Sequence, residues 1–328
     1  MNILIFGLGA LGTVYACLLK EKGHRVTGLA KKPVQEAVRE HGVSVTGIWG
    51  EHQAMLDEVA TGLDKLSVAQ FDLIIVTVKS YDTEKAAAAI ARVLTPATYM
   101  VLAQNGYGNF ETAAKYIPAH RLILGRVIFG AETTGLGRSK VTVIADDVIL
   151  GSPDRLIDHR QVEEIVSVCR EAGIPTRYSD QVMKYVWGKI IYNSALNSLG
   201  AILEVNYGKL AEVEYSRKLM EGVIREIFAV LDRTGQEMLW PDAQAYIKDF
   251  YEKLVPPTAL HHPSMLQDIQ RGRRTEIDAL NGAVVEMGRK HGVSTPVNEV
   301  IVALVKAKET MSLSFPGPNN CNNAAGKC

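Results

Sequence analysis

The chain has 328 residues, and its 36 Lys and Arg balance its 36 Asp and Glu, so the formal net charge is zero. This length predicts two domains, each with enough chain for a core of its own. The balanced charge gives no bulk electrostatic reason to expect a nucleic acid or a membrane surface as partner, and it favours small molecules.

The apolar runs and the cysteines narrow the class further. The longest apolar runs, such as residues 73–78, have the length of a strand and not of a membrane span. The chain enters a strand at once, without a basic leader, which predicts a cytoplasmic protein. The four cysteines, at 17, 169, 321 and 328, lack metal-ligand spacing, so we expect free thiols and no metal. None of these features fixes the oligomeric state, and a homodimer stays open.

A glycine-rich turn lies between the first predicted strand and the first predicted helix. It has the pattern G-x-G-x-x-G. After a strand, such glycines allow a tight turn, a close approach of the backbone to a pyrophosphate, and close packing of helix on strand. The N–H groups at the start of the helix can then hold the phosphate. The alternative is a chance glycine-rich turn. The residues predicted to bind a dinucleotide are Gly7, Leu8, Gly9, Ala10, Leu11 and Gly12.

The end of the second predicted strand, residues 25–30, indicates which dinucleotide binds. An NAD-selective site usually has a carboxylate about 20 residues after the glycines, where it binds the ribose hydroxyls. This chain has Lys31 and Lys32 there instead. Because two cations suit a 2′-phosphate, the sequence favours NADPH. The alternative is that both are ordinary solvated lysines.

Two further strand ends carry polar residues. The run 71–79 predicts a strand that ends at Lys79, and the next strand, 99–103, leads directly into Gln104 and Asn105. Ligands bind at the carboxyl ends of strands in open α/β sheets, so Lys79 and Asn105 are candidate ligand contacts. A single polar residue at a strand end is commonplace, because turns favour Asn and Gly.

The whole pattern predicts an α/β fold, with an N-terminal Rossmann-type doubly wound sheet and a second, all-helical C-terminal domain. Residues 40–60 suggest short strands of a small excursion, and 121–150 is rich in strand patterns. The expected helices of the second domain are 181–203, 209–235, 242–254, 264–270, 275–291 and 296–311. The predicted domains are 1–179 and 180–312, followed by a low-complexity tail, 313–328, that we expect to be disordered.

The first helix of the second domain carries a polar line on its apolar face. Lys189, Asn193 and Asn197 follow each other four residues apart, from the border of the apolar stripe into its middle. Polar groups placed there are costly unless something polar meets them, and a ligand is one such partner. In one interpretation, Lys189 donates a proton to a carbonyl substrate that the amides hold. In the other, the two Asn side chains satisfy backbone groups and the lysine reaches to water.

A second polar stretch begins at the predicted helix that follows the proline-rich break. Ser264 with Gln267 is typical of a capping box, which is the structural role of that hydroxyl. An N-cap serine can still present its oxygen to a ligand, because it lies at a helix end rich in N–H groups. Glu276 is either a site residue or the ion-pair partner of Arg273 or Arg274.

Together these motifs resemble the ketopantoate reductase family, whose members reduce 2-dehydropantoate to pantoate with NADPH for pantothenate and coenzyme A synthesis. The resemblance covers residues 1–311. Its most specific stretch is the one that contains Ser264 and Glu276. The matching motifs are GLGALG at 7–12, VTVK at 76–79, QNG at 104–106, WGKIIYN at 187–193 and SMLQDIQRGRRTEID at 264–278.

The resemblance implies a role for each matching position. The implied catalytic and substrate-binding residues are Lys189 as proton donor, Glu276, Asn193, Asn197, Ser264 and Asn105. The implied cofactor contacts beyond the glycine loop are Lys31 at the 2′-phosphate, Lys79, Asn105, Ala131 and Glu276. A cleft between the domains would hold the cofactor and a 2-oxo acid substrate. Lys189 would stabilise and protonate the alkoxide that forms on hydride transfer, while Glu276 would either tune Lys189 or bind the substrate hydroxyl.

One departure from the family leaves the substrate open. The family often has a further substrate asparagine in an N-G motif after the catalytic helix, whereas Asn206 lies one place early here. The distal end of the substrate is therefore expected to be held differently. Alternatives are a reductase of another branched 2-oxo acid, a β-hydroxyacid dehydrogenase, or a non-catalytic NADPH-binding sensor.

Overall fold

The structure, a computed structural model, describes residues 1–67 and 70–314. The chain forms two compact units, unit 1 from Met1 to Val186 and unit 2 from Trp187 onward. The boundary lies inside helix α6 (Val182–Leu203), so the first turn of this helix packs with unit 1. The predicted tail, 313–328, overlaps the end of helix α12 (Pro296–Ser314) and otherwise lies outside the described residues.

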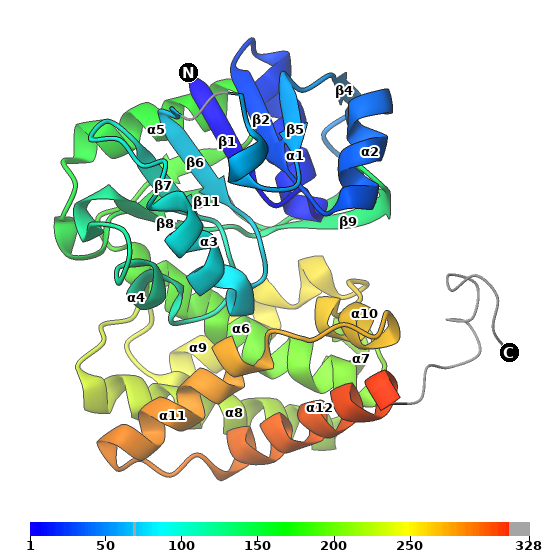
Figure 1. Cartoon of the computed structure of the whole chain (residues 1–328). Coiled ribbons are helices and arrows are strands. Elements are labelled where there is room, and N and C mark those ends of the chain that lie inside the picture. The colour runs from blue at the N-terminus through cyan, green and yellow to red at the C-terminus, as the bar shows by residue number, and fades with distance from the viewer. Residues whose placement is uncertain (68–69, 315–328) are drawn as a thin grey trace, which may run out of the picture. The chain divides into compact units, whose positions relative to one another are not determined.

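A mostly parallel sheet forms the centre of unit 1 (Figure 1). Within the described residues its strand order is β12-β11-β8-β7-β6-β1-β2-β5. All neighbours from β5 to β8 are parallel, in the 3-2-1-4-5-6 order of a Rossmann fold, and the chain order reverses between β1 and β6. The predicted doubly wound sheet is therefore confirmed. The strands are β1 (Asn2–Phe6), β2 (Arg25–Leu29), β5 (Glu58–Ala60), β6 (Leu73–Val76), β7 (Tyr99–Leu102), β8 (Leu122–Arg126), β11 (Val148–Gly151) and β12 (Thr176–Tyr178).

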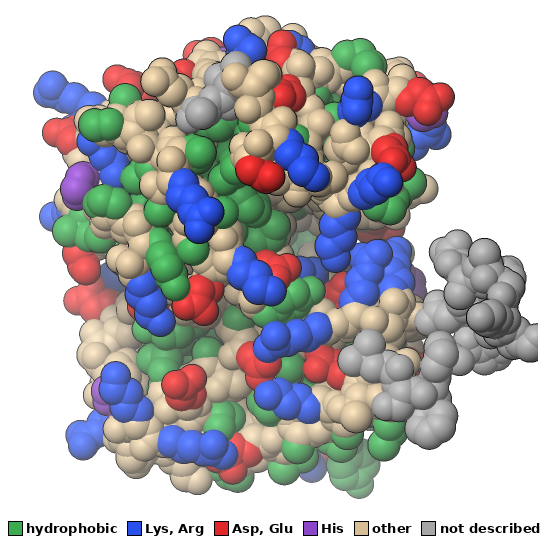
Figure 2. Space-filling view, in the orientation of Figure 1, with side chains coloured by type: hydrophobic (Ala, Val, Ile, Leu, Met, Phe, Trp, Pro, Cys, Tyr) green, Lys and Arg blue, Asp and Glu red, His purple; other side chains and the backbone are tan. Residues whose placement is uncertain are grey.

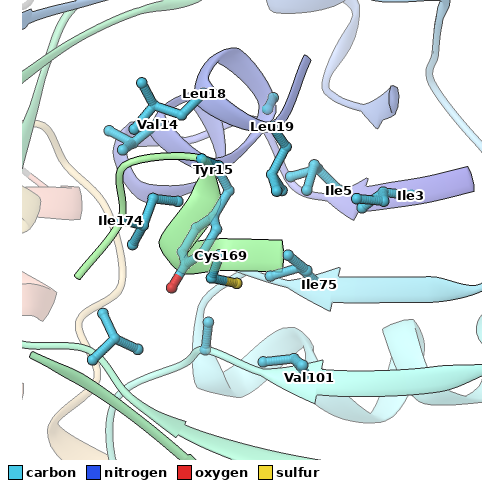
Figure 3. Close-up of a cluster of buried hydrophobic side chains, with 14 of the residues drawn as sticks. Ile3, Ile5, Val14, Tyr15, Leu18, Leu19, Ile75, Val101, Cys169 and Ile174 are labelled. Atoms are coloured by element: carbon cyan, nitrogen blue, oxygen red, sulfur yellow. The ribbon is translucent and has the colours of Figure 1, made fainter. Parts of the chain in front are cut away.

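The sequence explains why these strands lie inside. The four residues of β6, LIIV, are all buried, as is typical of parallel strands that helices cover. Figure 3 shows Leu19 of helix α1 beside Ile5 of β1. The helices of unit 1 before α6 are α1 (Ala10–Glu21), α2 (Lys32–His41), α3 (Thr83–Ile90), α4 (Asn109–Ala113) and α5 (His159–Glu171).

Two of the four cysteines lie in this core. Cys17 and Cys169 are buried and free, as predicted. Burial raises the pKa of each thiol to about 12, so both stay neutral at working pH. Cys321 and Cys328 lie outside the described residues.

The predicted excursion at 40–60 becomes part of a separate sheet. Among the described residues this sheet has the order β4-β3-β10-β9, so it joins the excursion to the strand-rich stretch 121–150. β3 pairs parallel with β10, which pairs antiparallel with β9. The third strand of the excursion, β5, instead extends the main sheet beside β2. The strands are β3 (Val43–Gly47), β4 (His52–Ala54), β9 (Phe129–Gly135) and β10 (Arg138–Ile144).

Unit 2 is helical, as predicted, but three helices differ in detail. The predicted helix 209–235 is two helices, because Val213 is extended between them. The predicted helix 242–254 ends as a π-helix over Phe250–Leu254, and the start of 275–291 is a 3-10 turn over Ile277–Ala279. The further helices are α7 (Tyr207–Glu212), α8 (Glu214–Thr234), α9 (Ala243–Asp249), α10 (Ser264–Gln270) and α11 (Asn281–His291).

The surface agrees with the balanced composition. Figure 2 shows Lys and Arg interspersed with Asp and Glu over the visible face. In the described part of the chain, every helix is too short or too polar to cross a membrane.

Candidate active site

The glycine loop after β1 has a backbone that only glycines can form. Gly7 has a φ of +113°, which L side chains rarely adopt. A Cβ on Gly12 would lie 1.9 Å from the Gly7 carbonyl oxygen. A Cβ on Gly9 would meet no atom within 4 Å, so this position is open. The first and third glycines are therefore required by the turn and by packing, while the second leaves room for a ligand.

The start of α1 supplies donors to that room. Gly9 is the N-cap residue and has no side chain to cap the helix. The first N–H groups of a helix have no partner within the helix, so those of Ala10, Leu11 and Gly12 can bind an anion. These residues fit the pyrophosphate of a dinucleotide.

A residue that the sequence analysis did not single out holds the loop in place. The Thr77 hydroxyl, directly after β6, donates a hydrogen bond of 2.6 Å to the Gly7 carbonyl oxygen. The N–H groups of Gly7 and Leu8 both donate to the Leu29 carbonyl oxygen at 3.1 Å. The loop is thus tied to the ends of β6 and β2 on its two sides. The sequence feature that could have identified Thr77 is its hydroxyl, which interrupts the apolar run of VTVK.

Lys31 follows β2 at the same edge of the sheet. It is the exposed N-cap residue of α2, and its ammonium group has no ion pair within residues 1–67 and 70–314. Lys32 lies 3.7 Å from Glu36 in an exposed pair. The two lysines therefore differ. Glu36 weakly compensates the positive charge of Lys32, while the charge of Lys31 faces solvent.

The ends of β6 and β7 carry Lys79 and Asn105, and a buried hydrogen-bond network joins these two ends. Gln104 Nε2 donates to the Val78 carbonyl oxygen at 2.9 Å and to the Thr83 hydroxyl at 2.8 Å. The Thr83 hydroxyl donates to Asn109 Oδ1 at 2.8 Å. The Asn109 amide returns to the Asn105 carbonyl oxygen at 2.9 Å.

This network fixes the two segments that hold Lys79 and Asn105. Thr83 and Asn109 are both buried, so a broken bond would leave a polar group without water. Sequence reasoning missed both residues, because a threonine and an asparagine at helix starts are usually caps. Only the pairing of β6 with β7 brings them together.

Ala131, a predicted cofactor contact, lies within β9 and pairs with Val141 of β10. It therefore belongs to the second sheet and not to a loop at the edge of the main sheet. The second sheet reaches the glycine loop through Ser139, whose hydroxyl donates a 3.0 Å hydrogen bond to the Ala10 carbonyl oxygen.

In unit 2, the polar line of α6 moves from partial to nearly complete burial along the helix. Lys189 is half-buried, while Asn193 is 8% and Asn197 is 6% exposed. The prediction that the line enters the apolar face is confirmed. The side-chain amide of Asn193 makes no hydrogen bond within the described part of the chain, so it can bind a ligand.

Asn197 has a structural partner that corrects the predicted capping box. Its Oδ1 accepts the Met265 N–H at 3.0 Å, and its Nδ2 donates to the Ser264 hydroxyl at 3.0 Å. The N-cap residue of α10 is Pro263, and no side-chain cap bond forms from within α10. The predicted Ser264–Gln267 box is therefore wrong, because an amide from α6 caps this helix instead.

Two neighbouring side chains are already engaged. Asn206, the displaced asparagine, caps α7 by accepting the Lys209 N–H at 3.0 Å. The Tyr192 hydroxyl bonds with the Thr258 hydroxyl. Burial raises the pKa of Tyr192 to about 12, although the bond with Thr258 acts in the opposite direction. This phenol is therefore a poor acid at neutral pH.

Glu276 lies at the start of the 3-10 turn before α11 and is 8% exposed. Its neighbour Thr275 is fixed from both sides, since its N–H donates to Glu309 at 2.5 Å and its hydroxyl accepts the Ile277 N–H at 3.2 Å. Of the two arginines expected as alternative partners, Arg273 and Arg274, the second also pairs with Asp278 at 3.0 Å. A buried carboxylate on such a fixed turn is well placed to act on a ligand or on a neighbouring cation.

Solved structures of known proteins resemble this chain over nearly its whole length. A ternary structure of D-mandelate dehydrogenase with NADH and anilino(oxo)acetate matches with a TM-score of 0.86 and 28% identity, covering 96% of this chain and 100% of that one. A PanE/ApbA family ketopantoate reductase from Ralstonia eutropha JMP134 matches with a TM-score of 0.83 and 28% identity, covering 94% and 99%.

Sequence comparison identifies the family. The 2-dehydropantoate 2-reductase of Aquifex aeolicus (strain VF5) is 46% identical over 314 residues, which cover 95% of this chain and 98% of the relative. The protein of the same name from Pyrococcus horikoshii is 31% identical over 95% of this chain and 98% of its own length. Family models described as ketopantoate reductase PanE/ApbA and its C terminal match residues 3–155 and 181–309. The chain therefore belongs to the ketopantoate reductase family, whose members are NADP-dependent oxidoreductases that act on a CH–OH group.

Proposed function

We propose that this protein reduces 2-dehydropantoate to pantoate with NADPH, and so acts in the cytoplasm in the synthesis of pantothenate and coenzyme A. The observation that carries the proposal is the polar line on α6, where a lysine precedes an almost buried amide that has no partner in the described residues. The 46% identical relative of the same name supports the choice of substrate.

The residues around the glycine loop would hold the cofactor. The N–H groups of residues 10–12 would bind the pyrophosphate, and Lys31 would bind the 2′-phosphate. Lys79 and Asn105, at the ends of β6 and β7, lie on the other side of the reversal point from β2. They would therefore contact the nicotinamide half. Ala131 is proposed as a backbone contact. When bound, NADPH supplies the hydride that reduces the C2 carbonyl.

On α6, Lys189 is proposed as the acid. Negative charge develops on the ketone oxygen as the carbonyl is reduced, and a protonated Lys189 would stabilise that charge and donate its proton to the oxygen. Asn193, Asn197 and Ser264 would hold the substrate. Because the amide of Asn197 already bonds to α10, we propose that Asn193 makes the stronger contact.

Glu276 has two proposed roles that can be separated. A carboxylate near Lys189 would raise the pKa of the lysine, so Glu276→Gln would then shift the pH profile of kcat to lower pH. A carboxylate that binds the substrate hydroxyl would leave the profile in place, and Glu276→Gln would raise KM instead. Measuring kcat and KM against pH for this one variant decides between them.

The test of the proposal is the rate of NADPH oxidation with 2-dehydropantoate beside other 2-oxo acids. The panel includes an aryl 2-oxo acid with NADH, because the similar D-mandelate dehydrogenase structure contains NADH and anilino(oxo)acetate. We expect the highest kcat/KM with 2-dehydropantoate and NADPH. A higher value with another branched or aryl 2-oxo acid would assign that substrate instead. NADPH binding without turnover of any member would identify a cofactor sensor. Light scattering at the assay concentration tests the homodimer.

A further inference from the structure

A chain of hydrogen bonds runs through the core of unit 2 and ends on α6. The Asn281 amide of α11 accepts the Ser198 hydroxyl at 2.6 Å and donates to the Ser194 carbonyl oxygen at 3.2 Å. The same amide donates to Asn298 Oδ1 of α12 at 2.9 Å. Asn298 Nδ2 then donates to Glu226 of α8 at 2.7 Å. Ser194, Ser198, Asn281 and Asn298 are all fully buried.

The direction of this chain is fixed at its far end. The Glu226 carboxylate accepts only, and it takes the N–H groups of Val297 and Asn298 at 2.8 and 3.0 Å in addition to the Asn298 amide. The Asn298 oxygen must therefore face Asn281. The oxygen of the Asn281 amide is left to accept the Ser198 hydroxyl. A rotated amide would set two oxygens against each other, so one arrangement is selected.

α6 needs such a constraint because apolar packing does not orient it. From residue 190 to residue 201 all positions except Tyr192 are buried. A helix that is buried on nearly all sides has no single apolar face that would set its rotation about its axis. Ser194 and Ser198 immediately follow Asn193 and Asn197 in sequence, so they lie about 100° around the helix from the proposed substrate amides.

We propose that Asn281 is a positioning residue that fixes the rotation of α6 and, with it, the directions of Lys189 and Asn193. This inference rests on the proposed function of the polar line. Neither Asn281 nor the two serines touch the substrate in this proposal. They act through the helix backbone, and the Ser194 carbonyl oxygen is the point at which the constraint is applied.

The test compares two buried serines of unit 2, of which only one bonds to Asn281. Ser198→Ala removes the hydroxyl that bonds to Asn281. Ser216→Ala is the matched control, because Ser216 is also buried and its hydroxyl donates to the Leu210 and Val213 carbonyl oxygens at 2.6 and 2.9 Å, away from α6. We expect similar falls in Tm for the two variants. Only Ser198→Ala should raise KM for 2-dehydropantoate, by about three- to tenfold, with the Kd of NADPH unchanged.

KM is the deciding quantity, because a loss of folded protein lowers kcat but leaves KM in place. Asn281→Leu, which removes all three bonds, should lower kcat/KM by about 10²-fold. If it does not fold, Ser198→Ala alone decides. Equal KM values for Ser198→Ala, Ser216→Ala and the unmodified protein would overturn the inference. If Asn193→Ala still raises KM in that case, the proposed function stands. If Asn193→Ala also leaves KM unchanged, the proposed role of the polar line fails with it.

Discussion

The glycine loop after β1 and the polar line on α6 are positioned by different means. The loop can form only because its glycines have no side chains, since a Cβ at Gly12 would overlap the Gly7 carbonyl oxygen. The polar line is held by hydrogen bonds, since the Asn197 amide and the adjacent serines bond to partners 67 to 87 residues away. A backbone that tolerates no side chain leaves its mark in a short motif. A side chain held by distant partners leaves no such motif in the sequence. Mutations in the two regions should therefore have different effects.

The largest expected effect is on the polar line. Lys189→Ala should lower kcat by about 10²–10⁴-fold, the range for a positioned acid, because no other side chain on this line can donate the proton. The Kd of NADPH should stay the same, since the glycine loop and Lys31, the proposed cofactor contacts, lie in unit 1. Both constants are measured on the same sample after its Tm has been checked. A folded variant with near-normal kcat would contradict the assignment of the acid.

The next effect separates folding from binding within the loop. Gly12→Ala places a Cβ 1.9 Å from a backbone oxygen, so the turn must move. We expect a lower Tm and a weakening of NADPH binding by about 100-fold or more. Gly9→Ala is the matched control, because its Cβ meets no protein atom within 4 Å. It should keep the Tm and still weaken NADPH binding through contact with the pyrophosphate. Normal NADPH affinity in Gly9→Ala would place the pyrophosphate elsewhere.

A smaller effect is expected at the 2′-phosphate. Charge-assisted hydrogen bonds contribute about 1.5–3 kcal/mol, so Lys31→Ala should weaken NADPH binding by about ten- to a hundredfold and leave NADH nearly unchanged. Lys32→Ala is the control and should have a smaller effect, because Glu36 lies 3.7 Å from the Lys32 ammonium. Fluorescence titration of both variants with NADPH and with NADH gives the four Kd values. If Lys31→Ala lost the same affinity for NADPH as for NADH, Lys31 would not contact the 2′-phosphate.

The smallest effect contrasts two asparagines of the same line. Asn197→Ala removes the cap of α10, which should cost about 0.5–2 kcal/mol of unfolding free energy. Asn193→Ala breaks no hydrogen bond of the described chain, so its free energy of unfolding should change little while KM for the substrate rises. Urea unfolding and steady-state kinetics on both variants supply the comparison. A larger loss of stability in Asn193→Ala than in Asn197→Ala would reverse these two roles.

Local patterns were enough to predict most of the fold and part of the site. The apolar runs, the three glycines and the helical periodicity gave the doubly wound sheet, the loop after β1 and the helical second unit. The half-buried Lys189 and the buried amides were also predictable, since periodicity alone places them on the apolar face. These features depend on neighbours within about one turn of helix or one strand, so the sequence determines them by itself.

The tertiary structure decided which polar groups have partners. Ser264 looked like the cap of its own helix, but Asn197 of α6 caps it. The sequence of the excursion at 40–60 did not indicate its role. In the structure β3 pairs with β10, and Ser139 of β10 donates a hydrogen bond to the start of α1. Thr77 was read only as part of a strand motif, yet it holds the glycine loop. A hydrogen bond between distant residues depends on atoms that only folding brings within 3 Å, and the order of residues along the chain carries no record of that distance.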